Sequence, residues 1–253
     1  MELKDSVSII TGGASGLGEA TARKFHSLGS KVCIFDLDNL RGKNLEQELG
    51  ENCVYFSVDV CNEPDLIQAI NAVINRFNKI NININCAGIA LAEKTLGKEG
   101  SHDLSRFKKI IDVNLIGTFN ILRLCAEKMA KNPLDKNHER GIIINTASVA
   151  ALEGQKGQVA YAASKGGVAA MTLPIARDLA REHIRCCCIA PGLFLTPMFE
   201  GLGEEVCEAL AKDVVFPKRL GDPNEFAEYA SQIVQNTYIN GSVMRLDGGI
   251  RLA

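Results

Sequence analysis

The chain has little of what marks membrane, secreted or nucleic-acid-binding proteins. Its 28 lysines and arginines nearly balance 30 acidic residues, and the net charge of −2 gives no electrostatic footprint for nucleic acid or an anionic membrane. No apolar run approaches the roughly 20 residues of a membrane-spanning helix. Residues 1–10 contain acids and lack an apolar core, so no targeting segment is visible there. We expect a soluble chain that binds a small molecule, without direct nucleic acid or membrane binding.

Cysteine and histidine show no spacing typical of a metal or disulfide site. The nine cysteines are an odd number, include no Cys-x-x-Cys pair and lie mostly in apolar runs. Cys186, Cys187 and Cys188 are consecutive, which alternates them across a strand instead of bringing them together on a metal. The four histidines also lack metal spacing. We expect no bound metal, and reduced, buried thiols as in a cytosolic or matrix-like compartment.

Short apolar runs alternate with amphipathic stretches along nearly the whole chain, a pattern typical of βα units around a parallel sheet. We expect strands at residues 7–11, 31–36, 53–58, 81–86, 141–146, 184–190 and 243–246. Helices are expected at 17–28, 40–49, 63–77, 104–130, 158–181 and 224–235. The length of 253 residues fits one large domain, and no linker divides it. The sequence therefore predicts a single-domain α/β fold over residues 1–253. This fold is a Rossmann-type doubly wound parallel sheet of about seven strands with helices on both faces.

Three segments depart from the regular pattern. Residues 81–86 alternate polar and apolar side chains, although a central parallel strand is usually apolar on both faces, so Asn83 needs a buried partner. Residues 89–103 and 192–217 are long irregular connections that follow predicted strands. Ligands bind at the carboxyl ends of strands in open α/β sheets, so both are candidate binding loops, and 192–217 is the candidate substrate loop. For 89–103 a variable surface loop is the alternative.

The first predicted strand leads through a glycine-rich turn directly into a helix. Gly12, Gly16 and Gly18 let the backbone turn tightly and approach a pyrophosphate, which the N–H groups of a helix N-terminus favour. The second strand ends at Asp36, whose carboxylate can accept hydrogen bonds from both hydroxyls of an adenosine ribose and would repel a 2′-phosphate. No lysine or arginine lies between Gly12 and Gly18 to bind such a phosphate. The sequence predicts a dinucleotide site that prefers NAD to NADP.

Tyr161 and Lys165 are four residues apart in a predicted helix, and Tyr161 follows Ser148 by thirteen residues. Positions i and i+4 share a helix face, so the phenol and the ammonium can converge. A tyrosine titrates near pH 10 and is a poor base until a neighbouring cation favours its phenolate. The pair alone is weak evidence, because a ring packed beside a surface lysine has the same spacing. Beside a dinucleotide site, it predicts proton chemistry.

Together these motifs resemble the short-chain dehydrogenase/reductase family over essentially the whole chain. Matching positions also include Asp59, Val60, Asn114 and residues 85–88 and 191–192. Finer matches at 143–148, 171–179, 190–194, 219–223 and 246–248 resemble one branch of it. That branch is the type 2 3-hydroxyacyl-CoA dehydrogenases, also called type 10 17β-hydroxysteroid dehydrogenases. The chain departs from the branch at Leu152, where a bulkier aromatic residue is common, so the shape of the substrate pocket is left open.

The resemblance implies a role for each matching residue. Tyr161 would be the general acid/base, and Lys165 would lower its pKa and hold the nicotinamide ribose. Ser148 would orient the substrate oxygen, and Asn114 would anchor a water that links Lys165 to solvent. Cofactor contacts are implied at Gly12, Ser15, Gly16, Leu17, Gly18, Asp36, Asp59, Val60, Cys86, Gly88, Tyr161, Lys165, Phe194 and Thr196.

The activity implied is NAD-dependent interconversion of a secondary alcohol and a ketone, chiefly 3-hydroxyacyl-CoA and 3-oxoacyl-CoA, with hydroxysteroids as secondary substrates. We further hypothesise that Lys94, Lys98 or Lys156 contacts the phosphates of CoA. One alternative is a 3-oxoacyl thioester reductase working in the biosynthetic direction. Another, from a different class, is a structural subunit of an RNA-processing assembly. The resemblance also implies a homotetramer and a mitochondrial matrix location, with the cytoplasm as the alternative.

Overall fold

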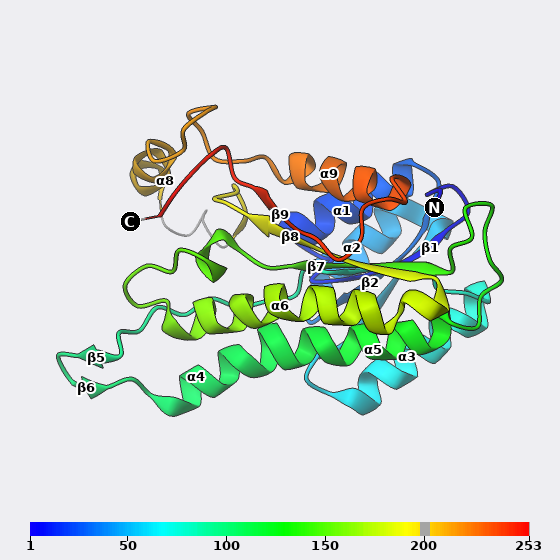
Figure 1. Ribbon diagram of the computed structural model, residues 1–253, viewed down its shortest axis with the longest axis horizontal. Helices are drawn as coiled ribbons and strands as arrows, with labels where there is room; N and C mark the ends of the chain where they lie inside the picture. Colours follow the sequence, from blue (N-terminus) through cyan, green and yellow to red (C-terminus); the bar gives the residue numbers. More distant parts are fainter. Residues whose placement is uncertain (198–202, 253) are drawn as a thin grey trace.

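A seven-stranded, entirely parallel sheet forms the centre of the protein (Figure 1). The computed structural model describes residues 1–197 and 203–252. The strands run in the order β3-β2-β1-β4-β7-β8-β9. They are β1 (Val7–Thr11), β2 (Lys31–Asp36), β3 (Cys53–Ser57), β4 (Ile82–Asn85), β7 (Gly141–Thr146), β8 (Ile184–Pro191) and β9 (Val243–Leu246). The order reverses between β1 and β4, which places a ligand crevice at the carboxyl ends of these strands.

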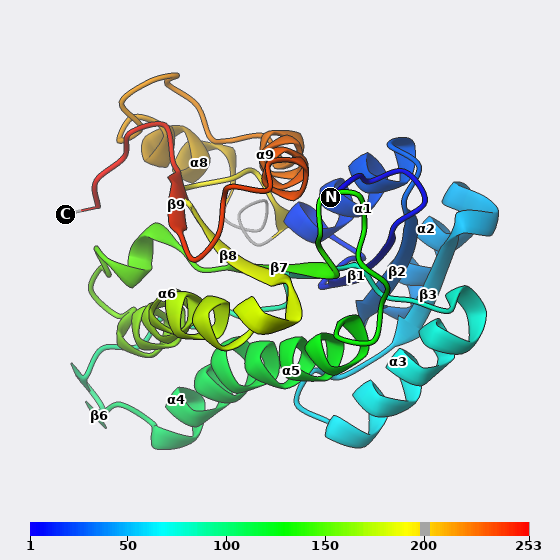
Figure 2. The same cartoon turned by 45° about the vertical axis from the view of Figure 1, so that its right-hand side comes forward.

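Helices cover both faces of this sheet, and each face has its own apolar core (Figure 2). On one face lie α1 (Gly16–Ser27), α2 (Asn39–Leu49) and α9 (Pro223–Gln235), where Phe25 and Phe226 pack against Ile82 and Ile84. On the other lie α3 (Glu63–Phe77), α4 (Leu104–Ile111), α5 (Thr118–Met129) and α6 (Val159–Asp178). Strands buried on both faces need apolar side chains at successive positions, which explains the apolar runs. The predicted doubly wound fold is confirmed.

The predicted helix at 104–130 is interrupted. Between α4 and α5 the backbone forms a π-helical segment, Asp112–Gly117, that contains Asn114. The Asn114 amide exchanges two hydrogen bonds with the backbone of Ile89, accepting at 2.8 Å and donating at 2.9 Å. A Cβ at Gly117 would lie 2.6 Å from the Val60 side chain. These tertiary contacts, which a helical periodicity does not encode, fix the wider turn, and such π segments are frequent at functional sites.

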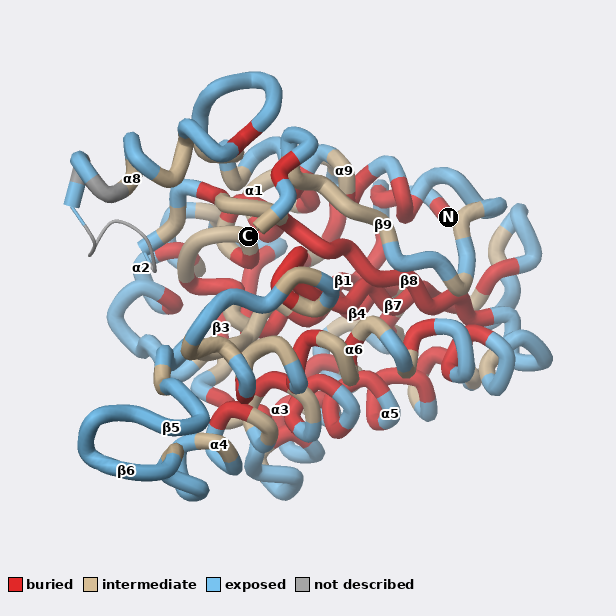
Figure 3. Tube along the Cα trace, turned by 60° about the vertical axis from the view of Figure 1, so that its left-hand side comes forward, coloured by how far each residue is buried: buried red, intermediate tan, exposed pale blue. Residues whose placement is uncertain are grey.

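The two irregular connections contain more structure than predicted. Residues 89–103 include a short antiparallel hairpin, β5 (Leu96–Gly97) and β6 (Gly100–Ser101), which projects from the body of the protein (Figure 3). The 192–217 segment contains α8 (Glu204–Ala211), so treating it as irregular throughout was wrong. Alanine and leucine in this run favour a helix, but eight residues are too few to show a clear period. Residues 198–202 of this loop lie outside the described residues.

Candidate active site

A cavity of about 630 Å³ lies at the carboxyl ends of the central strands. Its lining includes the glycine-rich turn, the end of β2, the segments that follow β3, β4, β7 and β8, and part of α6. All predicted catalytic and cofactor-binding residues except Asn114 line it, namely Gly12, Ser15, Gly16, Leu17, Gly18, Asp36, Asp59, Val60, Cys86, Gly88, Ser148, Tyr161, Lys165, Phe194 and Thr196. The fold thus brings together residues that are up to 184 positions apart in the sequence.

The glycine-rich turn has the geometry of a phosphate cradle. Gly12 has φ of 63°, and a Cβ there would lie 2.8 Å from the backbone nitrogen of Ala87. A Cβ at Gly18 would lie 2.1 Å from the carbonyl oxygen of Gly12. Helix α1 begins at Gly16, and the Ser15 side chain makes no capping hydrogen bond to it. The first N–H groups of α1 therefore face the cavity without a side-chain cap, as an anion site at a helix N-terminus requires.

Asp36 is fixed at the far end of the cavity. Its Oδ2 accepts a 3.0 Å hydrogen bond from the backbone N–H of Ala14, and its Oδ1 accepts one of 2.9 Å from that of Asp38. A carboxylate oxygen has a second lone pair, so both oxygens keep acceptor capacity towards the cavity. The carboxylate is thereby held at a set distance from the glycine-rich turn. These residues fit a dinucleotide, with its pyrophosphate on α1 and its ribose beside Asp36.

The ammonium of Lys165 is buried and donates a 2.7 Å hydrogen bond to the carbonyl oxygen of Thr146. Burial lowers the pKa of Lys165 to about 8, an effect that Cys188 and Cys86 partly oppose. The nitrogen lies 5.9 Å from the centroid of the Tyr161 ring. The pair therefore converges at the cavity, as the i, i+4 spacing predicts.

Tyr161 is a neutral phenol in this structure. Burial raises its pKa above the ordinary value, and a hydrogen bond with Ser148 opposes that rise. Ser148 is itself fixed as the N-cap of the short turn Val149–Ala151, where its Oγ accepts a 3.1 Å hydrogen bond from the Ala150 N–H. The lowering of the Tyr161 pKa by Lys165 stays a prediction for the cofactor-bound state.

Asn114 lies behind the cavity wall. Its Nδ2 donates to Ser164 Oγ at 3.1 Å, and Ser164 Oγ donates to the Tyr161 carbonyl at 2.8 Å. A Cβ at Gly88 would lie 3.2 Å from Asn114 Oδ1 and 3.5 Å from Lys165 Nζ. A glycine at position 88 therefore leaves the space between these polar groups open. The water-anchoring role of Asn114 stays a prediction.

Some residues of the cavity were not predicted from the sequence. They include Leu37, Lys109 and Val113. Leu37 directly follows Asp36, so its position after the second strand could have indicated that it lines the cavity. Lys109 and Val113 lie one helical turn apart on α4 and in the π segment, and their approach to the cavity depends on how that helix packs.

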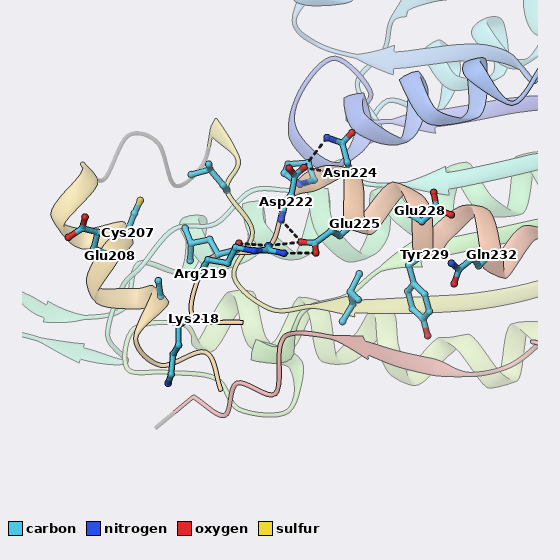
Figure 4. A pocket seen from close by; sticks show the side chains of 16 residues that line it. Cys207, Glu208, Lys218, Arg219, Asp222, Asn224, Glu225, Glu228, Tyr229 and Gln232 are labelled. Carbon is cyan, nitrogen blue, oxygen red and sulfur yellow. Dashed lines mark hydrogen bonds and ion pairs between the residues drawn. The ribbon is translucent and has the colours of Figure 1, made fainter. Parts of the chain in front are cut away.

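A larger cavity of about 1040 Å³ lies between α8 and α9 (Figure 4). Its wall includes the Arg219–Glu225 ion pair and the capping box of α9, in which Asp222 and Glu225 take part. None of the predicted catalytic residues lines it. The smaller cavity contains Ser148, Tyr161 and the buried Lys165, so it is the candidate active site.

Within residues 1–197 and 203–252, no group of His, Cys, Asp and Glu side chains has the arrangement of a metal site. Nor does that part of the chain contain a helix long and apolar enough to cross a membrane. The nine cysteines, all of them described, form no disulfide.

Comparison with known proteins identifies the family and the fold. The family model for short chain dehydrogenases matches residues 6–207. The Homo sapiens protein named 3-hydroxyacyl-CoA dehydrogenase type-2 is 51% identical over 252 residues, which cover 99% of this chain and 97% of that protein.

Two crystal structures are similar over nearly the whole chain. The 3-hydroxyacyl-CoA dehydrogenase type-2 of Mycobacterium avium has a TM-score of 0.94 and 43% identity, and covers 98% of this chain and 96% of its own. The 3-ketoacyl-(acyl-carrier-protein) reductase of Brucella melitensis, complexed with NADH, has a TM-score of 0.88 and 28% identity, with coverage of 98% and 99%. With its glycine cradle and its serine, tyrosine and lysine in one cavity, the chain belongs to the short chain dehydrogenase family and is an oxidoreductase.

Proposed function

We propose that the protein is an NAD-dependent 3-hydroxyacyl-CoA dehydrogenase, which interconverts the 3-hydroxyl and 3-oxo forms of an acyl-CoA. One observation carries the proposal: Ser148, Tyr161 and Lys165 line the same cavity as the glycine-rich turn and Asp36. An alcohol bound at Ser148 and Tyr161 therefore lies next to the dinucleotide site. The names of the human and mycobacterial relatives support the substrate class.

In the oxidation, Tyr161 accepts the proton of the substrate hydroxyl as a phenolate, the form that the cofactor-bound state is expected to favour. A nicotinamide cofactor held by the glycine-rich turn and Asp36 would supply the acceptor for the hydride of the adjacent carbon. Ser148 and Tyr161 line the same cavity, so both can stabilise the negative charge that develops on the substrate oxygen. Lys165 carries the positive charge nearest to the phenol, fixed by Thr146. In the reverse direction, Tyr161 donates the proton.

We propose NAD over NADP because of Asp36. The carboxylate is held by two backbone N–H groups at the end of β2, so it cannot easily turn away from a 2′-phosphate. Repulsion there would disfavour NADP. Asp59 and Val60, which follow β3, line the same end of the cavity.

Exposed lysines in the 89–103 loop and before α6 support an acyl-CoA substrate. The Glu93 N–H donates to the Gly157 carbonyl at 2.8 Å, so the segments that contain Lys94 and Lys156 lie side by side. Both lysines are exposed, as is Lys98 in the β5–β6 hairpin. Exposed ammonium groups of this kind suit the phosphates of CoA, which stay in solvent while the thioester enters the site.

The 3-oxoacyl thioester reductase remains the second candidate, favoured by the similarity to the Brucella melitensis reductase. Both candidates use the same chemical groups, and cofactor preference separates them. Hydroxysteroids are proposed as secondary substrates, since the apolar side chain of Leu152 is exposed at the end of the turn that Ser148 caps. A structural role in an RNA-processing assembly predicts that the assembly tolerates Tyr161→Phe, whereas the enzymatic reaction does not.

We propose a homotetramer for the assembled protein. Ile116 and Phe119, which lie one turn apart, are 53% and 48% exposed, and Leu173 on the neighbouring α6 is 45% exposed. Apolar side chains gathered on adjacent helices favour association with further copies. For location we propose the mitochondrial matrix, a reducing compartment that suits buried cysteines such as Cys33, Cys125 and Cys186.

A turnover screen tests the proposal. Purified protein is given NAD or NADP with 3-hydroxyacyl-CoA of several chain lengths, a hydroxysteroid and a simple secondary alcohol. The highest kcat/KM is expected for NAD with a 3-hydroxyacyl-CoA. A second assay tests whether lysines contact the CoA phosphates. It uses an acyl thioester of N-acetylcysteamine, which lacks these phosphates. Lys156→Ala should raise KM for acyl-CoA alone, and an equal rise for both thioesters would contradict the phosphate contact.

A further inference from the structure

A small apolar cluster, separate from the two large cores, joins three segments around the active site. Val149, Val214 and Ile250 are buried in it, and Leu193 and Leu252 pack against them. Val149 directly follows Ser148, Leu193 and Val214 lie near the two ends of the candidate substrate loop, and Ile250 belongs to the segment after β9. These segments lie on one side of the sheet (Figure 1). The cluster therefore fastens the Ser148 turn and the substrate loop to the carboxyl-terminal segment.

An ion pair completes this connection. Arg245 on β9 donates to Glu153 through two parallel hydrogen bonds, Nη1 to Oε1 at 2.8 Å and Nη2 to Oε2 at 3.2 Å. Glu153 also accepts a 3.1 Å hydrogen bond from the Leu252 N–H. The side chains of Arg245 and Glu153 are only 22% and 21% exposed. A bidentate, half-buried pair has a defined geometry that an exposed ion pair lacks.

Glu153 in turn contacts the catalytic segments. Its backbone N–H donates to the Val149 carbonyl at 3.0 Å and so closes the turn that Ser148 begins. The next residue, Gly154, packs so closely on α6 that a Cβ there would lie 2.8 Å from Cβ of Ala162. Ala162 directly follows Tyr161. Glu153 thus occupies the junction between the serine turn and the first turn of the helix that carries the phenol.

Arg245 also fixes the end of the substrate loop. Its Nε donates to Asp247 at 2.5 Å and its Nη2 to the Ile250 carbonyl at 2.8 Å. These contacts shape the turn at Gly248, whose carbonyl accepts from the N–H groups of Val215 and Phe216 at 3.1 and 3.0 Å. The Arg245 guanidinium therefore connects the serine turn to the returning end of the substrate loop, and the more exposed Arg251 pairs with the same two carboxylates, Glu153 and Asp247.

We propose that Arg245 is a positioning residue for the reaction, and that it acts through Glu153 on Ser148. Neither Arg245 nor Glu153 lines the cofactor cavity, so neither touches the reacting atoms. The inference rests on the proposed role of Ser148 in orienting the substrate oxygen. Without the pair, Ser148 and the substrate loop are no longer held in position relative to Tyr161. The glycine-rich turn and Asp36 belong to distant strands, so the cofactor site keeps its geometry.

The experiment measures oxidation by Arg245→Met and Glu153→Gln. We expect kcat to fall about 10- to 100-fold, as misplacement of a positioned group does, while the Kd for NAD stays within about twofold. Arg245→Lys should recover part of the loss, because it keeps one hydrogen bond and the charge. Arg140→Met is the matched control, since that arginine is 27% exposed and pairs with Glu182 at 3.2 Å near the amino end of β7. Its kcat should equal that of the wild type.

A double-mutant cycle distinguishes positioning from general destabilisation. In a Ser148→Ala background, Arg245→Met should lower kcat by less than about threefold, because the group it positions is absent. Equal effects in both backgrounds, or a matching loss of NAD affinity, would overturn the proposal. If Arg245→Met does not fold, the same cycle is run with Glu153→Gln. The substrate is whichever secondary alcohol the wild type oxidises fastest, so a wrong acyl-CoA assignment would appear in the turnover screen and leave this result interpretable.

Discussion

The ammonium group of Lys165 donates a 2.7 Å hydrogen bond to the carbonyl oxygen of Thr146. Thr146 is the last residue of β7 and precedes Ser148 by two positions. The end of one strand therefore fixes two groups of the active site, the cation through a backbone carbonyl and the serine through the chain itself. This arrangement holds the charge beside Tyr161 but requires burial of an ammonium in the protein interior.

We predict that Lys165→Met stabilises the ligand-free protein at pH 7. Burial lowers the pKa of Lys165 from 10.5 to about 8, so the charged form is disfavoured in the folded state. This cost of burying the charged ammonium, which destabilises the folded state, is fully present below pH 8. Removing it should raise the free energy of unfolding by about 1 to 3 kcal/mol, although the variant loses dehydrogenase activity. Urea unfolding at pH 7 measures the difference.

The same substitution has a predicted pH dependence. Between pH 8 and 10.5 the unfolded chain binds a proton at this lysine that the folded chain does not, so the stability contribution of Lys165 rises with pH. The advantage of Lys165→Met should therefore shrink from pH 8 to 9.5. Lys43→Met on exposed α2 serves as the control and should show no such trend. A stability difference that is independent of pH would contradict burial as the cause.

A pair of glycine substitutions tests the phosphate cradle. Gly12 and Gly50 have φ of 63° and 76°, so alanine at either position carries backbone strain of about 1 to 3 kcal/mol. At Gly12 the added Cβ would also lie 2.8 Å from the Ala87 nitrogen, whereas at Gly50 nothing lies within 4 Å. Gly12→Ala should abolish measurable NAD binding in calorimetry, and Gly50→Ala should retain it. Similar losses of affinity in both variants would mean that the turn does not hold the cofactor.

Replacing Asp36 should change the cofactor preference. In Asp36→Ala the ribose loses its charged acceptor, and we expect the KM for NAD to rise about 10- to 100-fold. The KM for NADP should stay the same or fall, because the repulsion of a 2′-phosphate is removed. Asp38→Ala is the comparison, since Asp38 caps α2 and does not line the cavity. If Asp36→Ala raised both KM values equally, Asp36 would not discriminate between the cofactors.

Most of the fold followed from periodicity and glycine placement. The six helical and seven strand segments expected from the sequence all correspond to elements of the structure, because parallel βα units need apolar strands and amphipathic helices. The cavity residues were predictable for a different reason: Gly12, Asp36, Ser148 and Tyr161 each follow or face the carboxyl end of a strand. The topology alone brings such positions together.

What the sequence did not reveal depends on contacts between distant segments. The π turn at Asn114 is fixed by the Ile89 backbone, and Lys109 reaches the cavity only because that helix packs beside it. The pairing of Arg245 with Glu153 joins residues 92 positions apart. Local propensity carries no information about such pairs, since many arginines and glutamates are available in the chain.

The buried amides of β4 and β7 give a final prediction, because they provide the partner that Asn83 needs. Asn85 Nδ2 donates to Asn83 Oδ1 at 2.9 Å and to Asn145 Oδ1 at 2.8 Å, and all three side chains are buried. Asn85→Ala should lower the free energy of unfolding by about 2 to 4 kcal/mol, because it leaves the buried Asn83 amide without its partner and Asn145 Oδ1 without its donor. Thermal unfolding measures the loss.

A compensating variant separates lost pairing from lost packing. Asn83→Val combined with Asn85→Leu and Asn145→Leu removes the amides together, so no polar group remains unsatisfied. This triple variant should be more stable than Asn85→Ala, although it contains more changes. If the triple variant were less stable, the three asparagines would stabilise the protein through the packing of their side chains and not through their hydrogen bonds. Dehydrogenase activity gives a second measurement. Asn145 directly precedes Thr146, whose carbonyl oxygen accepts the hydrogen bond from Lys165. Loss of the asparagine hydrogen bonds should therefore displace this carbonyl and lower kcat more than the affinity for NAD.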